Sequence, residues 1–196
     1  MIAVGIDPGT RRLGWGVVVR RGRRLEHVAH GVIRLDARQG LAQRLERIAH
    51  ELGEVLTCHR PEVGSVETLF FHKDAQAAAK LGHARGVVLL SLARAGVAVA
   101  EYAPAHVKRT VAGNGQADKI QVALMVRALL GLRELPPADA ADALALAVTH
   151  LRVGQLSQAA RPHSKAGARG RAGAKAALAA LLDRGTRVRS NVRRFG

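Results

Sequence analysis

Four acidic residues in three separate segments could together form the site of a metal-dependent phosphodiesterase. Asp7 ends the apolar run IAVGID just before a Pro-Gly turn, and Glu67 ends the run VGSVE. Asp139 and Asp142 are three residues apart in PADAADALALA, and residues i and i+3 lie on one face of a helix. Because a carboxylate that ends an apolar strand is costly unless it is solvated or paired, these acids are candidates for a site.

Carboxylate oxygens suit Mg²⁺, and two such ions about 3.5–4 Å apart can activate a water and stabilise a leaving 3′ oxygen. The four acids therefore predict a hydrolytic site with two Mg²⁺ per subunit, for which Mn²⁺ could substitute. Each acid also has a structural alternative. Asp7 could be a turn residue, and Asp139 could be favoured by the positive end of a helix dipole. Asp142 lies deeper in its helix, where that explanation is weaker.

Basic residues lie near these acids in the sequence. Lys108 and Arg109 precede the segment Gly-Asn-Gly and Lys119 follows it, which suits contact with phosphate or with transition-state charge. Arg11 and Arg12, close behind the first acid, are further candidates for phosphate binding. The alternative for each is an ordinary exposed cation.

Phe70 and Phe71 follow Glu67 by three and four residues. Beside a phosphodiesterase site, an aromatic ring can stack on an unpaired base. The alternative is that one or both rings fill the core beneath the loop.

The nine histidines show no spacing typical of metal ligands. His27 and His30 are three apart on a predicted strand, so we expect them to face opposite sides. His150 is the histidine that could approach the face of Asp139 and Asp142.

Hydrophobic periodicity predicts the elements that must position these residues. Three strands come first, followed by a helix, a strand, a helix, a strand and further helices. This order predicts an α/β fold with a mixed five-stranded sheet flanked by helices on both faces, as in ribonuclease-H-like folds. The predicted strands are 2–7, 15–21, 23–35, 63–67 and 97–102, and the predicted helices are 40–58, 74–95, 103–112, 118–130 and 138–153.

Composition and charge point to a polyanionic partner. The chain has 31 Lys and Arg against 15 Asp and Glu, a formal net charge of +16. Such an excess favours DNA, RNA or an anionic membrane, although it could also be a solubilising surface charge. Residues 1–156 are predicted to be the folded domain. Residues 157–196 are rich in Gly, Ala and basic residues, and they are predicted to be a disordered basic tail.

One cysteine, Cys58, cannot form a disulfide within the chain, and its helical pattern predicts a small core residue. The first residues lack the pattern of a signal peptide, and no apolar run is long enough to span a membrane. We therefore expect a soluble, intracellular, cytoplasmic protein without a membrane partner.

Five segments resemble, in order and spacing, the motifs of the bacterial RuvC family of Holliday junction resolvases, or crossover junction endodeoxyribonucleases. The resemblance covers about residues 1–156, and the sequence departs from the family mainly in its tail, which is longer and more basic than usual. The segments are GIDPGTRRLGWGVV, VETLFF, AAAKLGHARGV, VKRTVAGNGQADKIQV and PADAADALALAVTH.

The resemblance implies a ribonuclease-H-like homodimer that nicks four-way junction DNA with Mg²⁺ during homologous recombination and DNA repair. It also implies cooperation with the branch-migration proteins RuvA and RuvB, and a preference for short sequences at the cut. The family's four acidic positions fall on Asp7, Glu67, Asp139 and Asp142, and its DNA contacts fall on Phe70, Lys108 and Lys119.

Three other functions fit the residues less well. A ribosomal-RNA-processing nuclease of the same fold lacks the segment VKRTVAGNGQADK. A non-catalytic junction-binding protein has no need for four acids, which repel DNA unless metals neutralise them. A sugar kinase would need a second phosphate loop and a longer chain. For the homodimer, the Ala- and Gly-rich helix 74–95 is the expected interface, because small residues permit close helix approach.

Overall fold

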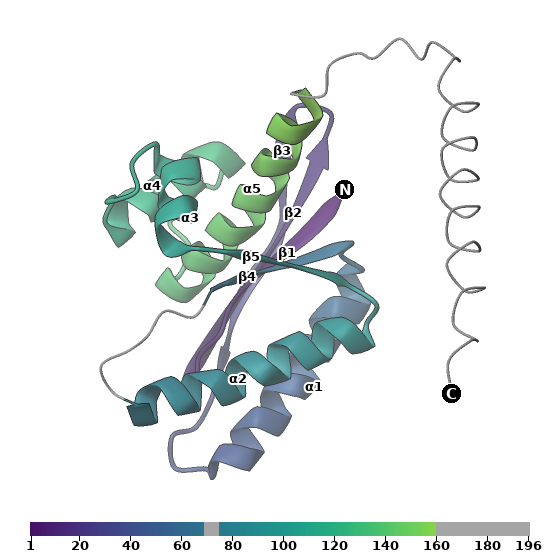
Figure 1. Cartoon of the computed structure of the whole chain (residues 1–196), viewed down its shortest axis with the longest axis vertical. Helices are drawn as coiled ribbons and strands as arrows, with labels where there is room; N and C mark the ends of the chain where they lie inside the picture. The colour runs from purple at the N-terminus through teal and green to yellow at the C-terminus, as the bar shows by residue number, and fades with distance from the viewer. Residues whose placement is uncertain (69–74, 160–196) are drawn as a thin grey trace, which may run out of the picture. The chain divides into compact units, whose positions relative to one another are not determined.

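The computed structural model describes residues 1–68 and 75–159, which are built around a five-stranded sheet (Figure 1). The first three strands form an antiparallel meander, and the last two run parallel to β1, giving the order β3-β2-β1-β4-β5. This arrangement confirms the predicted mixed sheet. The strands are β1 (Ile2–Asp7), β2 (Arg12–Arg21), β3 (Arg24–Arg34), β4 (Val63–Glu67) and β5 (Ala98–Tyr102).

Five helices accompany the sheet in this part of the chain. The parallel strands require crossovers, which α1 makes between β3 and β4 and α2 makes between β4 and β5. The other three helices follow β5. No helix in residues 1–68 and 75–159 is long and apolar enough to cross a lipid bilayer. The helices are α1 (Leu41–His59), α2 (Ala75–Arg94), α3 (Pro104–Ala112), α4 (Lys119–Leu130) and α5 (Ala138–Ala159).

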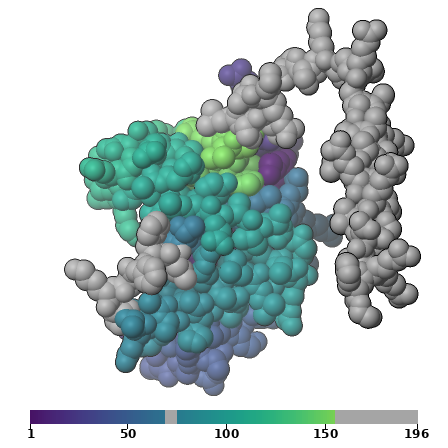
Figure 2. All heavy atoms as spheres, in the orientation of Figure 1, coloured from purple at the N-terminus to yellow at the C-terminus, as the bar shows by residue number. Residues whose placement is uncertain are grey.

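The helices cover both faces of the sheet, as predicted (Figure 1). On one face, Leu52 of α1 and Leu92 of α2 belong to a core cluster with Val4 and Ile6 of β1. On the other face, Ala3 of β1 belongs to a second cluster with side chains of α3, α4 and α5. The outer surfaces of α3 and α4 are seen at the upper left of Figure 2.

Alternation along β1 decides which face its last residue meets. Val4 and Ile6 point to the α1–α2 face, whereas Ala3 points to the α5 face. Because successive side chains of a strand alternate, Asp7 shares the α5 face with Ala3.

Strand β2 begins at Arg12, three residues before its predicted start. Gly14 pairs with Asp7, and Gly16 pairs with Gly5. Both glycines lie in the ladder beneath α5. Helix α5 extends to Ala159, beyond its predicted end at residue 153.

The predicted orientation of two histidines on β3 is wrong. Val17 pairs with Ala29 and Val18 pairs with His27, so Val28 is an extra residue and forms a β-bulge. A bulge shifts the alternation by one residue. His27 Nε2 therefore lies 2.8 Å from His30 Nδ1, on the same side of the sheet.

The prediction that Cys58 is a core residue is also wrong, because its side chain is exposed. The buried residues of α1 are Ile48, Leu52 and Leu56, spaced four apart. Cys58 lies two residues beyond Leu56, which is about 200° around a helix of 3.6 residues per turn and hence on the opposite face.

Candidate active site

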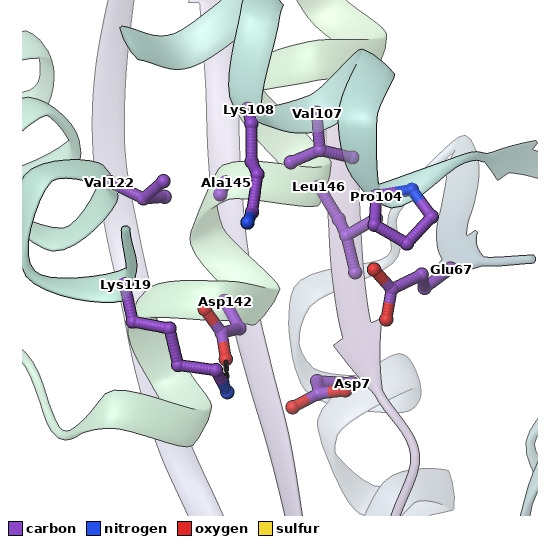
Figure 3. A pocket seen from close by; sticks show the side chains of 10 residues that line it. All are labelled: Asp7, Glu67, Pro104, Val107, Lys108, Lys119, Val122, Asp142, Ala145 and Leu146. Atoms are coloured by element: carbon purple, nitrogen blue, oxygen red, sulfur yellow. Dashed lines mark hydrogen bonds and ion pairs between the residues drawn. The ribbon is translucent and has the colours of Figure 1, made fainter. Parts of the chain in front are cut away.

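A cavity of about 270 Å³ lies where β1 and β4 end, between the sheet and α3, α4 and α5 (Figure 3). It brings together three of the four predicted carboxylates and two of the predicted basic residues. Sequence reasoning did not identify the apolar part of the lining, whose residues carry no chemical signal of their own. The lining is Asp7, Glu67, Lys108, Lys119 and Asp142, with Pro104, Val107, Val122, Ala145 and Leu146.

The parallel pairing of β1 and β4 places Asp7 and Glu67 at the same edge of the sheet. Ile6 pairs with Val66, and each acid is the next and last residue of its strand. Since paired residues on neighbouring strands point the same way, both carboxylates lie on the face that α5 covers. The predicted placement of both acids at strand ends is confirmed.

Helix α5 lies close against β1 and β2 because glycine occupies the contact points. A Cβ atom on Gly5 would overlap the carbonyl oxygen of Ala143, and one on Gly14 would overlap that of Asp139. Without these side chains the backbones approach closely, and the Asp142 carboxylate reaches the cavity beside Asp7 (Figure 3). The GID and LGWG segments thus position an acid more than 120 residues away.

Asp139 lies next to the cavity but is not part of its lining. Its carboxylate is 3.8 Å from the guanidinium of Arg12. It is still close enough to Asp7 to raise the pKa of that acid. The structure therefore groups all four predicted acids, three of them in the lining and one beside it.

The acids destabilise one another's charged forms. Burial, and then the charges of Asp142 and Glu67, raise the pKa of Asp7 from 3.8 to about 7. Burial and the charge of Asp142 likewise raise the pKa of Glu67, while Lys119 and Lys108 oppose that shift. Such mutual repulsion in a partly desolvated cavity is typical of a functional site rather than of a structural ion pair.

Lys119 is the first residue of α4 and points into the cavity (Figure 3). Asp118 caps the helix by accepting a hydrogen bond from the Gln121 amide at 2.8 Å, which defines where α4 begins. The Lys119 ammonium donates to Asp142 Oδ2 at 3.0 Å, and this bond raises the pKa of the lysine. Lys108, on α3, also lines the cavity.

The three predicted basic residues outside the cavity are Arg11, Arg12 and Arg109. All three are exposed, and none of them belongs to the lining. Arg12 contacts Asp139, as described above. Their predicted contacts with phosphate remain predictions.

Two other predictions concern aromatic and histidine side chains. Phe70 and Phe71 lie outside the described residues, as does the tail beyond residue 159. His150 is directed to Tyr102, whose hydroxyl lies 2.8 Å from its Nδ1 atom, and it does not line the cavity.

The donor set fits a hard divalent cation, because it consists of carboxylate oxygens that repel one another. A bound cation would relieve that repulsion. Among the residues with described placement, no group of three or more histidine, cysteine or acidic side chains already stands in an arrangement that could hold a metal ion. The Lys119 ammonium instead neutralises Asp142.

The chain matches the family model for the crossover junction endodeoxyribonuclease RuvC over residues 3–150. A protein of that name from Sorangium cellulosum is 61% identical over 151 residues, which are 77% of this chain and 84% of the relative. Another, from Methylorubrum populi, is 50% identical over 182 residues, covering 92% of this chain and 96% of the relative.

Solved structures give the same result. Thermus thermophilus RuvC in complex with a Holliday junction substrate is 42% identical, with a TM-score of 0.76, and the match covers 80% of this chain and 96% of that one. The yeast mitochondrial Holliday junction resolvase matches with a TM-score of 0.61 over 81% of each chain. At 12% identity, this second likeness shows the fold alone.

Proposed function

This chain belongs to the RuvC family of crossover junction endodeoxyribonucleases, and we propose that the cavity between β1, β4 and α5 is where it cuts DNA. Members of this family are metal-dependent nucleases that resolve Holliday junctions during recombination and repair. The observation that carries the proposal is the convergence of Asp7, Glu67 and Asp142 with Lys108 and Lys119 in one cavity.

Asp7, Glu67, Asp139 and Asp142 are the proposed ligands of two Mg²⁺ ions, with Mn²⁺ as a substitute. When bound, such ions supply an activated water and stabilise the leaving 3′ oxygen. Burial and neighbouring carboxylates disfavour the charged forms of Asp7 and Glu67. A bound cation would neutralise this negative charge, which supports the assignment. To serve as a metal ligand, Asp142 would have to give up its contact with Lys119.

Lys119 and Lys108 are the proposed phosphate contacts. Their ammonium groups face the cavity from α4 and α3, opposite Asp7 and Glu67 (Figure 3). A phosphodiester between these two sides would place its oxygens near the lysines, where positive charge stabilises the charge that develops in the transition state. Arg11, Arg12 and Arg109 are proposed as weaker contacts to flanking phosphates, and Phe70 as the residue that stacks on a junction base.

The proposed assembly is a homodimer in which each subunit cuts one of two equivalent strands of a symmetric junction. Helix α2 is the proposed interface, supported by its exposed Leu90. Cooperation with RuvA and RuvB is carried over from the family. Action on chromosomal junctions would place the protein in the cytoplasm.

The test is nicking of a labelled four-way junction with and without Mg²⁺, using Asp7→Asn. We expect this variant to bind the junction normally in a gel shift. Its cleavage rate should fall by at least about 100-fold, because losing a metal ligand should reduce activity at least as much as losing a residue that supports one. Glu54→Gln is the control, since it removes one negative charge from an exposed position on α1. Normal nicking by Asp7→Asn would remove Asp7 from the site, and absence of nicking by the unchanged protein would favour a non-catalytic junction-binding protein.

A further inference from the structure

Arg85 is a buried cation in the middle of helix α2. It is 7% exposed, although it lies among the apolar residues Ala84, Val88 and Leu92 that pack against the sheet. A buried arginine strongly destabilises a fold unless its guanidinium group finds partners. Its presence in an apolar helix face therefore requires an explanation from its contacts.

The guanidinium of Arg85 joins two strands. One terminal nitrogen donates to the backbone carbonyl of Glu67 at the end of β4. The other lies 2.5 Å from the Glu101 carboxylate on β5, which holds the group in place. The planar fork of arginine can make both contacts at once, whereas lysine presents a single point of charge.

The contacted carbonyl belongs to a residue that has only one strand neighbour. Pairing between β1 and β4 ends at Ile6 and Val66, so Glu67 keeps only β5 as a ladder partner. The Thr68 amide donates to the Tyr102 carbonyl on β5 at 2.9 Å. In a planar trans peptide the C=O and N–H point in opposite directions, so the Glu67 carbonyl faces the side where pairing with β1 has ended. Arg85 supplies the missing hydrogen bond there.

We propose that Arg85 is a positioning residue that fixes the backbone of Glu67 and so aims its carboxylate at the metal site. This inference rests on the proposed function, because it takes Glu67 to be a metal ligand. The effect is geometric rather than electrostatic. Burial, Asp142, Lys119 and Lys108 account for the raised pKa of Glu67, and Arg85 is not among the causes.

The experiment measures Mn²⁺ binding to the DNA-free protein by electron paramagnetic resonance titration, alongside thermal unfolding and junction binding without metal. Arg85→Gln removes both contacts of the guanidinium group, and Glu101→Gln weakens its ion pair with Glu101. We expect Arg85→Gln to bind Mn²⁺ about 10–100-fold more weakly, the usual loss when a residue supporting a metal ligand is removed. Junction affinity without metal should stay within about twofold, because Arg85 is buried away from DNA.

Arg20→Gln is the matched control. Arg20 also donates to a backbone carbonyl, that of Leu151 at 3.3 Å, but it lies at the other end of the sheet. The variant Arg20→Gln should therefore leave Mn²⁺ binding unchanged. If Arg85→Gln does not fold, Arg85→Lys and Glu101→Gln answer the same question, and both should weaken Mn²⁺ binding by a smaller factor.

The double variant with Glu67→Gln separates positioning from general damage. If Arg85 acts through Glu67, Arg85→Gln should cause no further loss of Mn²⁺ binding once the Glu67 carboxylate is gone. Unchanged Mn²⁺ binding in a folded Arg85 variant, or fully additive losses in the double variant, would overturn the inference. Unchanged Mn²⁺ binding in Glu67→Gln alone would instead overturn the proposed metal site.

Discussion

At the scale of single residues, the acids could be identified from the sequence because each ends an apolar strand or recurs on a helix. Their pKa values could not be predicted in the same way. The raised pKa of Asp7 depends on burial and on neighbours 60 and 135 residues away in the chain. The contact between Arg85 and Glu67 could not be predicted either, since it is made to a backbone carbonyl, which every residue has. A charged residue within an apolar helix face was the available signal.

Asp7 should make the metal-free fold less stable as the pH rises. Its pKa is raised from 3.8 to about 7 in the folded protein, so the folded state holds this proton more tightly than the unfolded chain does. The free-energy cost of ionising Asp7 in the folded protein is absent below pH 3.8 and grows between pH 3.8 and about pH 7. Above pH 7 it lowers the free energy of unfolding by about 4 kcal/mol. Asp7→Asn cannot ionise, so it should be the more stable protein at pH 8.

Urea unfolding in EDTA, at pH 8 and at pH 5, measures this effect. The stability advantage of Asp7→Asn should shrink to less than half at pH 5, where the folded wild-type protein keeps its proton. Saturating Mg²⁺ at pH 8 should also reduce it, because binding to the wild-type carboxylates stabilises the folded state. If Asp7→Asn were more stable than the wild-type protein by the same amount at both pH values, the difference would come from packing and not from charge.

Phe70→Ala should weaken cleavage of a fully paired junction more than cleavage of a junction with an unpaired centre. This prediction comes from the sequence and the family, since Phe70 lies outside the described residues. Stacking on a base contributes about 1–3 kcal/mol, and an open junction needs less of it. Cleavage rates on the two substrates give the comparison, and equal losses would indicate that the ring only fills the core.

At the scale of elements, hydrophobic periodicity predicted every strand and helix in the described part of the chain, with errors at places that periodicity cannot show. The start of β2 was missed because Gly14 has no side chain that could extend the pattern of residues 15–21. The bulge at Val28 was missed because the residue types of β3 do not mark which residue is the extra one.

Gly14→Ala should disrupt the docking of α5. Its methyl group would overlap the backbone of Asp139, which cannot rotate away as a side chain can. We expect a loss of at least about 1–3 kcal/mol in the free energy of unfolding, and a fall in cleavage because Asp139 and Asp142 are displaced.

Gly53→Ala is the control for this variant. A methyl group there has no heavy atom within 4 Å, and the position is inside α1. It should stabilise the protein by about 0.5–1 kcal/mol and leave cleavage unchanged. Urea unfolding and nicking assays on both variants make the comparison. Normal cleavage by Gly14→Ala would show that α5 tolerates a shift from the sheet.

At the scale of the whole molecule, positive charge is concentrated at the C-terminus, where residues 161–196 hold ten Lys and Arg and one acid. Removing these residues should leave junction selectivity intact while weakening binding to any DNA. A segment with few large apolar groups contributes little to a core, but it can bind phosphates without reading shape or sequence.

Plots of log affinity against log salt concentration, for full-length and truncated protein, test the role of this segment. The slope should fall by about one for each phosphate that the truncated protein no longer binds. Duplex and four-way junction should be affected alike. Equal slopes for the two proteins would exclude DNA binding by the segment, and reduced selectivity for the junction would place the boundary of the folded domain later than residue 156.

The docking of α5 on β1 has a consequence for the timing of synthesis. The ribosome makes β1 first, yet Asp7 acquires its partner Asp142 only after α5 has emerged and packed against the sheet. A nascent chain, or a fragment from an interrupted message, therefore carries the first acids of the site without an assembled cavity. Because a helix translated late completes the cavity that the first strand begins, we expect N-terminal fragments that lack α5 to have no nicking activity.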